Sequence, residues 1–544
     1  MSHTARAAQW VDAVIFDLGR QMRWTFLPPL MVYFAAGFSG LTMIVGTFFV
    51  KEYLDLSAAF LAGLAFWAGL PWALKMPLGH LVDIMWRWKW LLVHLGAGLI
   101  AGSVFIMYLL LTQTQAMVAI MPMGAWYVTS YLLAPTGLVI QDAVADAMSV
   151  EAVPRIDENG KDLDPETSRA LHTTMQTLGR FALISGTVAV ALLNITMFSG
   201  IEALDAEGKR AVYASIYLAA LAIPLVSVSG VVLAGVQKWR ARRGLLGRGL
   251  TEAEADALFE RTDEETTPNP WYFIGGAAFV ALSLTIGLSD MAMGQEIIFA
   301  GSMAIVLLLM RQLVAVLPVA QARTLIGTAI IIFIFRAVPR VGDGYTWFSI
   351  DVLGFDQQFL SVLSLIASVL TLVGMLILRP LIAHHSIVYI IVVLTIAGGV
   401  LSLPNIGLYY GIQNITAPLT GGIVDARFIA IMDTALESPL GQIAMIPMLA
   451  WIARNAPPDL KATFFAVMAS FTNLALSASS LFTRYLNQIF VVTREVRDPV
   501  SGAITASADY SQLGLLILIV SGLTVALPLL AVALVQRTRL RSVD

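Results

Sequence analysis

The sequence predicts an all-α integral membrane protein, and three observations lead to this fold class. Of its 544 residues, 58% are hydrophobic and only 13% are charged, with a mean hydropathy of +0.79. A soluble domain carries about 25% charged residues, so this chain could not cover its apolar surface in water. The apolar residues also recur in runs of about 20 or more, the length that a helix needs to cross a bilayer.

Fourteen such spans can be counted along the chain. They lie near residues 27–50, 57–76, 90–111, 117–147, 170–198, 211–236, 271–291, 296–318, 324–349, 357–378, 384–404, 425–453, 461–488 and 512–535. Six spans precede a polar stretch, two follow it, and six more complete the chain. This order predicts two six-helix bundles with an inserted pair, and internal repeats are how many transporters build a midplane binding site.

The predicted organisation has five parts. They are an amphipathic N-terminal segment (1–26), an N-terminal six-helix bundle (27–236), a cytoplasmic linker (237–270), two inserted helices (271–320) and a C-terminal six-helix bundle (321–544). The inserted pair has no counterpart in the first half. We therefore expect it to pack outside the bundle and to contribute little to the substrate path.

The distribution of positive charge predicts the orientation in the membrane. Most of the 33 lysine and arginine residues fall on one side when the N-terminus is placed in the cytoplasm. Because cytoplasmic loops are enriched in these residues, both termini are predicted to be cytoplasmic, in the inner (plasma) membrane of a bacterium. No cysteine, phosphate-binding Gly-Lys loop or metal-ligand spacing is visible. We expect no enzyme activity, metal, cofactor or nucleic-acid partner, and the oligomeric state stays open.

A group of charged residues lies at the bend between the second and third spans. Pro77 and Gly79 are expected to end the second span, with Gly79 allowing two helices to approach closely. Asp83 can cap the next helix or pair with Arg87. The group forms either a latch that gates one conformation or a structural turn with solvated charges. Lys75 lies about one turn inside the span, where it either reaches the headgroups or faces a cavity.

An acidic pair in the fourth span is a candidate proton-carrying site. Asp142 and Asp146 are four residues apart and share one helix face, where their charges repel. A helix end that emerges into the cytoplasm would also tolerate them. Arg180, about ten residues into the fifth span, needs an acidic partner, and this carboxylate face is the natural candidate. The arginine then either receives an anionic group of the substrate or forms a fixed intramembrane ion pair.

The second half holds a similar acidic pair. Asp433 and Glu437 lie deeper in an apolar span, which makes proton coupling the favoured interpretation over a neutral carboxyl bonded across helices. Arg336 precedes Pro339, two glycines and several aromatic residues, which together predict a broken helix. That segment either lines a cavity for a flat anionic ring or caps a helix within an interfacial aromatic belt. Asn473 either contacts the substrate or bonds a neighbouring helix.

Several of these segments resemble a known family. Gly79-His80-Leu81-Val82-Asp83, with Arg87 and Lys89 beyond, resembles the loop motif between helices two and three of the major facilitator superfamily. The longer run from Pro71 to Asp83 resembles the folate–biopterin transporter family within it. Similar matches to that family are the acidic run Asp142, Asp146 and Glu151, the Arg-x-x-Pro stretch at Arg336, Leu353-Gly354-Phe355, and the late span that begins near Pro457.

The resemblance implies a secondary transporter that works by alternating access, with folates or pterins as substrates and protons as the coupling ion. The residues alone indicate an amphiphilic or polar organic solute, with Arg180 and Arg336 as its anion contacts and the two acidic pairs as titrating groups. Two alternatives stay open, the first of which has a similar helix and loop pattern. One is a muropeptide permease, and the other is a membrane assembly factor related to light-harvesting complex assembly proteins that transports nothing.

Overall fold

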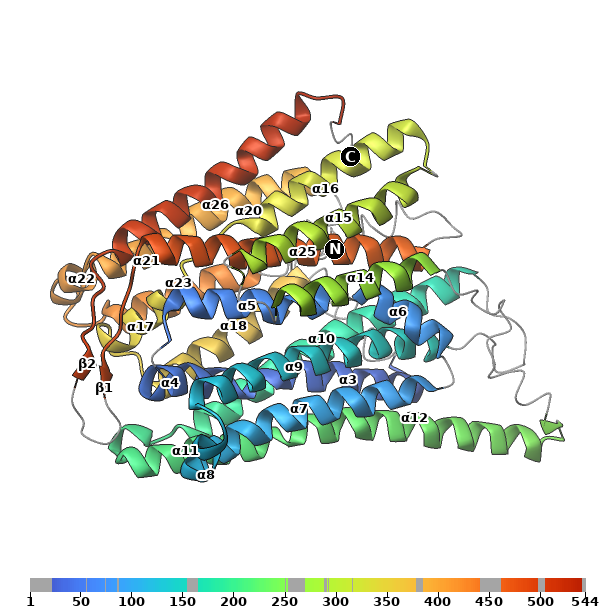
Figure 1. Cartoon of the computed structure of the whole chain (residues 1–544), viewed down its shortest axis with the longest axis horizontal. Coiled ribbons are helices and arrows are strands. Elements are labelled where there is room, and N and C mark those ends of the chain that lie inside the picture. Colours follow the sequence, from blue (N-terminus) through green and yellow to red (C-terminus); the bar gives the residue numbers. More distant parts are fainter. Residues whose placement is uncertain are drawn as a thin grey trace, which may run out of the picture.

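The computed structural model describes residues 22–540, except for 55, 74, 86–87, 154–164, 250, 253–269, 288–290, 292, 316, 378–384, 441–460 and 498–503. These residues form a bundle of long helices that run roughly side by side (Figure 1). The predicted N-terminal segment 1–26 lies mostly outside the described residues.

Within the described residues, the first half contains ten α-helices, several of which pair up to make one span. They are α3 (Leu27–Phe38), α4 (Met43–Tyr53), α5 (Ala58–Ala73), α6 (Lys75–Ile84), α7 (Lys89–Thr112), α8 (Thr114–Ile120), α9 (Met123–Glu151), α10 (Pro165–Met197), α11 (Ala206–Ala220) and α12 (Ala222–Gly247). The pairs α3–α4, α5–α6 and α11–α12 are continuations of one another, so the described part of this half matches the six predicted spans.

The inserted pair and the second half follow. The pair is α14 (Pro270–Gly287) and α15 (Gly294–Val314). The second half contains α16 (Val319–Ala337), α17 (Asp343–Asp351), α18 (Gln357–Ile377), α20 (Ile387–Leu401), α21 (Leu403–Tyr409), α22 (Gln413–Leu419), α23 (Ala426–Glu437), α25 (Lys461–Ile489) and α26 (Leu513–Gln536). The strands β1 (Val496–Arg497) and β2 (Ile504–Ala506) pair antiparallel between α25 and α26, a small addition to the predicted all-α fold.

Eleven segments of the described chain are long and apolar enough to cross a membrane. The other three predicted spans correspond to α14, α23 and α25. Of these, α14 holds a shorter apolar stretch over Ile274–Ser283, and α23 is followed by residues outside the description. The protein is an integral membrane protein, and the number fourteen stays a prediction.

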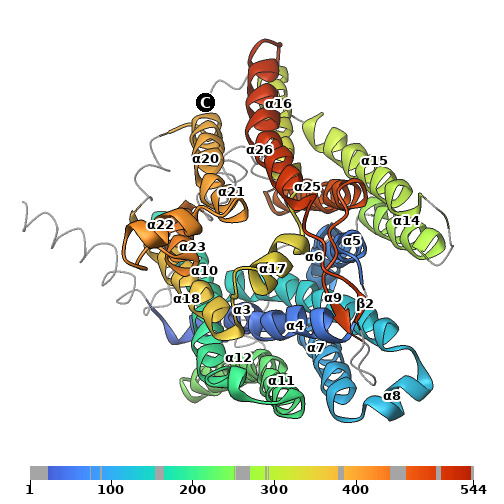
Figure 2. The same cartoon turned by 90° about the vertical axis from the view of Figure 1, so that its left-hand side faces the viewer.

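Two helix pairs join the halves. Helix α5 packs along α25, and α10 packs along α18, so each half contributes two helices to the seam (Figure 2). Helices α14 and α15 lie outside this arrangement, where α15 packs on α25 and α14 on α6. The inserted pair therefore lies at the periphery of the described structure.

The bundle has two ends, named here the hairpin end and the linker end. The hairpin end holds the C-terminus of α4 together with α17, β1 and β2, at the left of Figure 1. The linker end holds the C-termini of α6 and α12, at the right. When the seam is closed at one end, a space between the two halves can be reached only from the other end.

Close helix packing in the first half depends on two facing glycines. A Cβ atom built on Gly137 of α9 would lie 2.5 Å from the carbonyl oxygen of Gly96 on α7. A Cβ atom on Gly96 would lie 2.6 Å from the carbonyl oxygen of Gly137. No side chain fits between these backbones, so small residues permit the crossing. Below it, Gln141 donates from Nε2 to the carbonyl of Val93 at 3.1 Å, which ties the same two helices.

The apolar second span, Ala58–Gly79, ends at Gly79 as the sequence predicts, but the helix does not, because α6 continues to Ile84. Pro77 lies in the first turn of α6, where the missing N–H would have no intrahelical partner in any case. Open space surrounds the Cα of Gly79, and the close approach is made instead by Gly276 of α14, whose Cβ would lie 2.9 Å from Pro77.

The predicted linker also begins too early. Helix α12 continues beyond Val236 to Gly247, and this extension carries lysine, arginine, glutamine and leucine. These are good helix formers, so the helix persists after its apolar stretch ends.

Candidate functional site

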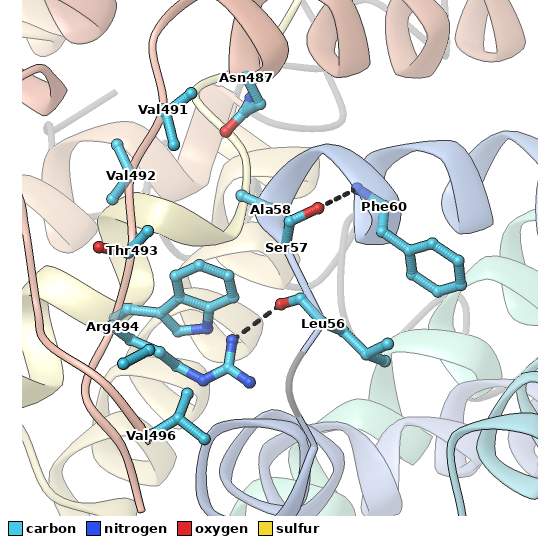
Figure 3. Close-up of a pocket in the computed structure, with 12 residues that line it drawn as sticks. Leu56, Ser57, Ala58, Phe60, Asn487, Val491, Val492, Thr493, Arg494 and Val496 are labelled. Atoms are coloured by element: carbon cyan, nitrogen blue, oxygen red, sulfur yellow. Dashed lines mark hydrogen bonds between the residues drawn. The ribbon is translucent and has the colours of Figure 1, made fainter. Parts of the chain in front are cut away.

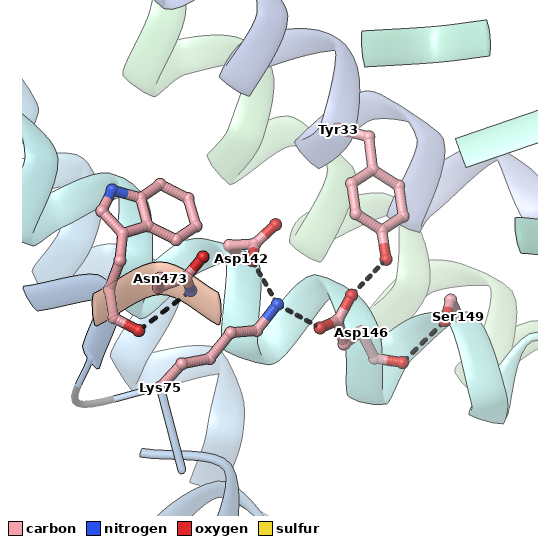
Figure 4. A network of polar contacts seen from close by, with 7 residues as sticks. Tyr33, Lys75, Asp142, Asp146, Ser149 and Asn473 are labelled. Atoms are coloured by element: carbon pink, nitrogen blue, oxygen red, sulfur yellow. Dashed lines mark hydrogen bonds and ion pairs between the residues drawn. The ribbon is translucent and has the colours of Figure 1, made fainter. Parts of the chain in front are cut away.

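An ion-pair site lies in the first half, between α6 and α9. The Nζ atom of Lys75 lies 2.6 Å from Oδ2 of Asp142 and 2.7 Å from Oδ2 of Asp146 (Figure 4). The Lys75 and Asp142 side chains are only 21% and 15% exposed. The four-residue spacing on α9 turns both carboxylates toward the same neighbour, and Lys75 reaches them because it is the first residue of α6. Lys75 therefore faces the protein rather than the headgroups.

Two further contacts extend this site along α9. The phenol of Tyr33, on α3, donates to Oδ1 of Asp146 at 2.7 Å. Near the linker end, Nζ of Lys89 lies 2.7 Å from Oε2 of Glu151. All three acidic residues of the predicted run are thus held by basic or phenolic groups from other helices. Pairing of this kind removes most of the cost of holding a charge near hydrocarbon.

The expected partner of Asp142 and Asp146 was Arg180, and this expectation is not met. In the described part of the chain, the ion pairs of both carboxylates are made with Lys75. Arg180 on α10 lies near enough to act electrostatically on Asp142 without a direct ion pair. The physical reason is packing: α6 lies directly along α9, and α10 makes far less contact with that helix.

The predicted latch is only partly visible. Lys75 forms the ion pairs described above, and Gly79 faces open space. The Asp83 side chain and Arg87 lie outside the described residues. The latch of these residues therefore stays a prediction, except that Lys75 is engaged within the first half.

A second polar site lies in the other half, around Asp433 of α23. Nδ2 of Asn405 donates to Oδ2 of Asp433 at 2.9 Å, and the phenol of Tyr345 donates to Oδ1 of Asn405 at 2.7 Å. Asp433 is 7% exposed, and within the described chain its Oδ1 atom is buried without a hydrogen-bond partner. Glu437, one turn further along α23, is more exposed. A carboxylate with one bonded and one free oxygen can take up a proton at the free oxygen.

The break predicted near Pro339 is present. Helix α16 ends at Ala337, and α17 begins at Asp343. Polar side chains of α25 bond the backbone between them: the hydroxyl of Ser479 donates to the Val338 carbonyl at 2.6 Å, and the Arg340 amide donates to the Thr483 hydroxyl at 2.8 Å. These freed groups are therefore satisfied inside the protein. Arg336 occupies the last turn of α16, at the edge of this break.

Asn473 bonds a neighbouring helix. Its Nδ2 donates to the carbonyl of Trp72 at 3.2 Å, near the end of α5 (Figure 4). Since α25 belongs to the second half, this bond crosses the seam beside Lys75. Sequence reasoning missed Asn405 and Tyr33. Asn405 lies just past the expected end of its span, and the only signal at Tyr33 was a phenol within an apolar run.

Comparison with solved structures gives the class of the fold. A mutant of a peptide transporter, POT, aligns with a TM-score of 0.58 at 13% identity, over 95% of each chain. A mutant of the nucleoside transporter NupG aligns with a TM-score of 0.55 at 13% identity, over 94% of this chain and 98% of that one. Identity this low shows the fold alone, which is that of major-facilitator-type transporters.

Sequence comparison gives the family. The family model described as the BT1 family matches residues 36–543, and the chain belongs to this family. The folate-biopterin transporter of a Synechocystis species is 23% identical over 481 residues, which cover 86% of this chain and 76% of that protein. Folate transporter 2 of Plasmodium falciparum is 24% identical over 173 residues, or 30% of this chain and 35% of that protein. The protein is thus a secondary transporter of a small organic solute, and not an enzyme.

Proposed function

We propose that this transporter carries folate- or pterin-like solutes together with protons. The substrate class follows the names of its relatives in Synechocystis and Plasmodium. The expected membrane is the inner membrane of a bacterium, with the linker end and both termini in the cytoplasm. Clustered basic residues on the extension of α12 support this orientation; they are Lys238, Arg240, Arg242 and Arg243.

The observation that carries the proton-coupling proposal is the surroundings of Asp433. Burial of an ionised carboxylate is costly unless both oxygens are bonded, and only Oδ2 has a partner in the described chain. A proton on Oδ1 removes the charge while Oδ2 keeps its bond to Asn405. Tyr345 and Asn405 hold the carboxyl in place through either state. Asp433 can therefore be loaded and unloaded without loss of local structure.

Two arginines, one from each half, are proposed to contact the carboxylate of the substrate. Arg180 acts on the first-half acidic site without an ion pair of its own to Asp142 or Asp146. Arg336 lies beside the helix break of the second half. An arginine offers several donors in a planar arrangement that suits a carboxylate. Asp142, Asp146 and Lys75 are proposed to form an ion-paired structural support for this region rather than the coupling site.

Uptake into proteoliposomes tests the proposal. Wild-type protein should accumulate a radiolabelled pterin or folate when the outside is acidic, and a proton ionophore should abolish accumulation. Asp433→Asn should lose this accumulation while retaining exchange of labelled for unlabelled substrate, because exchange requires no net proton movement. Asp425→Asn is the matched control: Asp425 caps the same helix by accepting from the Phe428 amide, and asparagine caps equally well.

Three results would overturn the proposal. Accumulation by Asp433→Asn at the wild-type level would remove Asp433 from the coupling mechanism. Accumulation of muropeptides but not of pterins or folates would replace the substrate class. A complete lack of uptake, with co-purification of a membrane complex, would favour an assembly factor.

A further inference from the structure

The C-terminal end of α4 meets the second half at the hairpin end of the bundle. Helix α4 ends at Tyr53, so its last carbonyl groups lack the usual N–H partners of a continuing helix, apart from the Val50 carbonyl, which accepts from the Leu54 N–H. These carbonyls also carry the negative end of the helix dipole. A cation from elsewhere in the chain is the partner that such a helix end favours.

That cation is Arg494, which lies between α25 and β1. Its Nε donates to the Lys51 carbonyl at 3.2 Å, and its Nη2 donates to the Val50 carbonyl at 2.7 Å. Its Nη1 donates to the Leu56 carbonyl at 2.9 Å, the bond drawn in Figure 3. Nη2 also donates to the Leu54 carbonyl. The arginine belongs to the second half and all four acceptors to the first. Arg494 is only 3% exposed, although the sequence would place it in a solvated loop.

Trp347 packs against this arginine. The Arg494 guanidinium carbon lies 4.5 Å from the centre of the Trp347 ring. Trp347, on α17 of the second half, is 1% exposed and packs into the main hydrophobic core of the first half. The indole and the guanidinium thus both contact the first half, and a cation–π contact joins them to each other.

Other contacts across the seam surround Arg494. Nζ of Lys51 lies 2.6 Å from Oδ1 of Asp351, and the phenol of Tyr510 donates to Oδ2 of Asp351 at 2.5 Å. Burial and this hydrogen bond raise the pKa of Tyr510, so the phenol stays a donor at neutral pH. Further along the seam, Gln357 of α18 donates to the Tyr213 hydroxyl of α11 at 2.9 Å. The Lys51–Asp351 and Gln357–Tyr213 contacts join one half to the other, whereas the Tyr510–Asp351 bond lies within the second half and holds Asp351 in place.

We propose that the hydrogen bonds from Arg494 to the carbonyls at the end of α4 hold the hairpin end of the transporter closed, and we call this contact the clasp. The structure is then the state closed at this end, and opening there requires the guanidinium to leave these carbonyls. The clasp needs only that the protein is a transporter with two moving halves. It does not depend on the identity of the substrate or on proton coupling.

Two features make this contact suitable for repeated opening. Two pockets of about 390 Å³ and 540 Å³ adjoin it, the first lined by Ala58, Trp347 and Arg494 and the second by Lys51, Asp351 and Tyr510. The acceptors are backbone carbonyls, which water can bond as soon as the arginine withdraws. One residue therefore controls a large share of the contacts that hold this end shut.

Cysteine labelling tests the clasp directly, because the natural chain contains no cysteine. Ala58 lines the smaller cavity and is 2% exposed, so Ala58→Cys reports opening of the seam. We expect a hydrophilic maleimide to label Ala58→Cys in purified protein about tenfold faster when Arg494→Ala or Arg494→Lys is added. Lysine keeps the charge but cannot bond several carbonyls at once, so it should open the seam with less effect on folding.

Two controls separate opening from unfolding. Arg427→Ala removes another arginine, which bonds Asp356 and the Gly354 carbonyl within the second half, and should leave labelling unchanged. Ser103→Cys reports on the α7–α9 interface, where the Ser103 hydroxyl bonds the Ser130 carbonyl, away from the seam.

Labelling of Ala58→Cys at the wild-type rate in both Arg494 variants would overturn the proposal. An equal rise at Ser103→Cys would overturn it as well, because Arg494 would then stabilise the whole fold. Failure of folate uptake alone would leave the labelling result, and hence the clasp, unaffected.

Discussion

Lys75 and Asp142 form a 2.6 Å ion pair between the start of α6 and the interior of α9, and Asp146 shares the same lysine at 2.7 Å. One cation thus serves two carboxylates. A buried pair is worth little against an apolar replacement, but removal of one partner leaves an uncompensated charge. The three residues should therefore respond to mutation as a unit, and the lysine should be the most sensitive of them.

Lys75→Met should destabilise the protein by about 3–5 kcal/mol, because it leaves two neighbouring carboxylates without a cation. Asp142→Asn should cost less, since Lys75 keeps Asp146 as a partner. Thermal unfolding in detergent, followed by tryptophan fluorescence, measures both. Lys209→Met is the control: Nζ of Lys209 lies 3.9 Å from an exposed Glu202, and its loss should cost less than about 1 kcal/mol. An unfolding temperature of Lys75→Met equal to that of the wild type would contradict this ranking.

Arg180→Leu should fold normally and transport poorly. The described Asp142 and Asp146 are paired with Lys75, so loss of Arg180 leaves no carboxylate without its cation. If Arg180 instead meets an anionic substrate, its loss should raise KM for folate at least about tenfold, as expected for a lost charged hydrogen bond. Initial uptake rates over a range of substrate concentrations provide the test. An unchanged KM would make Arg180 a structural residue.

The hydrogen-bond network at Asp433 predicts that two variants impair proton-driven uptake to different degrees. Asn405→Leu removes the donor to Oδ2 and leaves Asp433 without its bond in the described chain, whereas Tyr345→Phe removes only the outer bond at 2.7 Å. Neutral hydrogen bonds contribute about 1 kcal/mol, and bonds to charged groups more. Uptake driven by a pH gradient should therefore fall strongly in Asn405→Leu and mildly in Tyr345→Phe, while exchange persists in both. Equal losses in the two variants, or none, would argue against an ordered path from Tyr345 to Asp433.

The positions of these groups explain which features of the fold and of the site could be predicted from the sequence. Long apolar runs and the helix-breaking Pro339 depend on local chemistry, so the spans and the break of α16 were predictable. The partner of Asp142 was not, because Lys75 and Arg180 both lie on spans that could adjoin α9, and only packing decides between them. Arg494 reads as an ordinary loop charge until the end of α4 is placed beside it.

The facing glycines of α7 and α9 give a test of packing alone. Gly137→Ala would bring a methyl group to 2.5 Å from the Gly96 carbonyl oxygen, so the helices must separate. Overpacking of this kind costs about 1–3 kcal/mol, which should lower the unfolding temperature. Gly102→Ala, on the same α7, meets no atom within 4 Å and should be neutral or slightly stabilising, since alanine is the better helix former. If both variants unfold at the same temperature, α7 and α9 do not cross at these glycines.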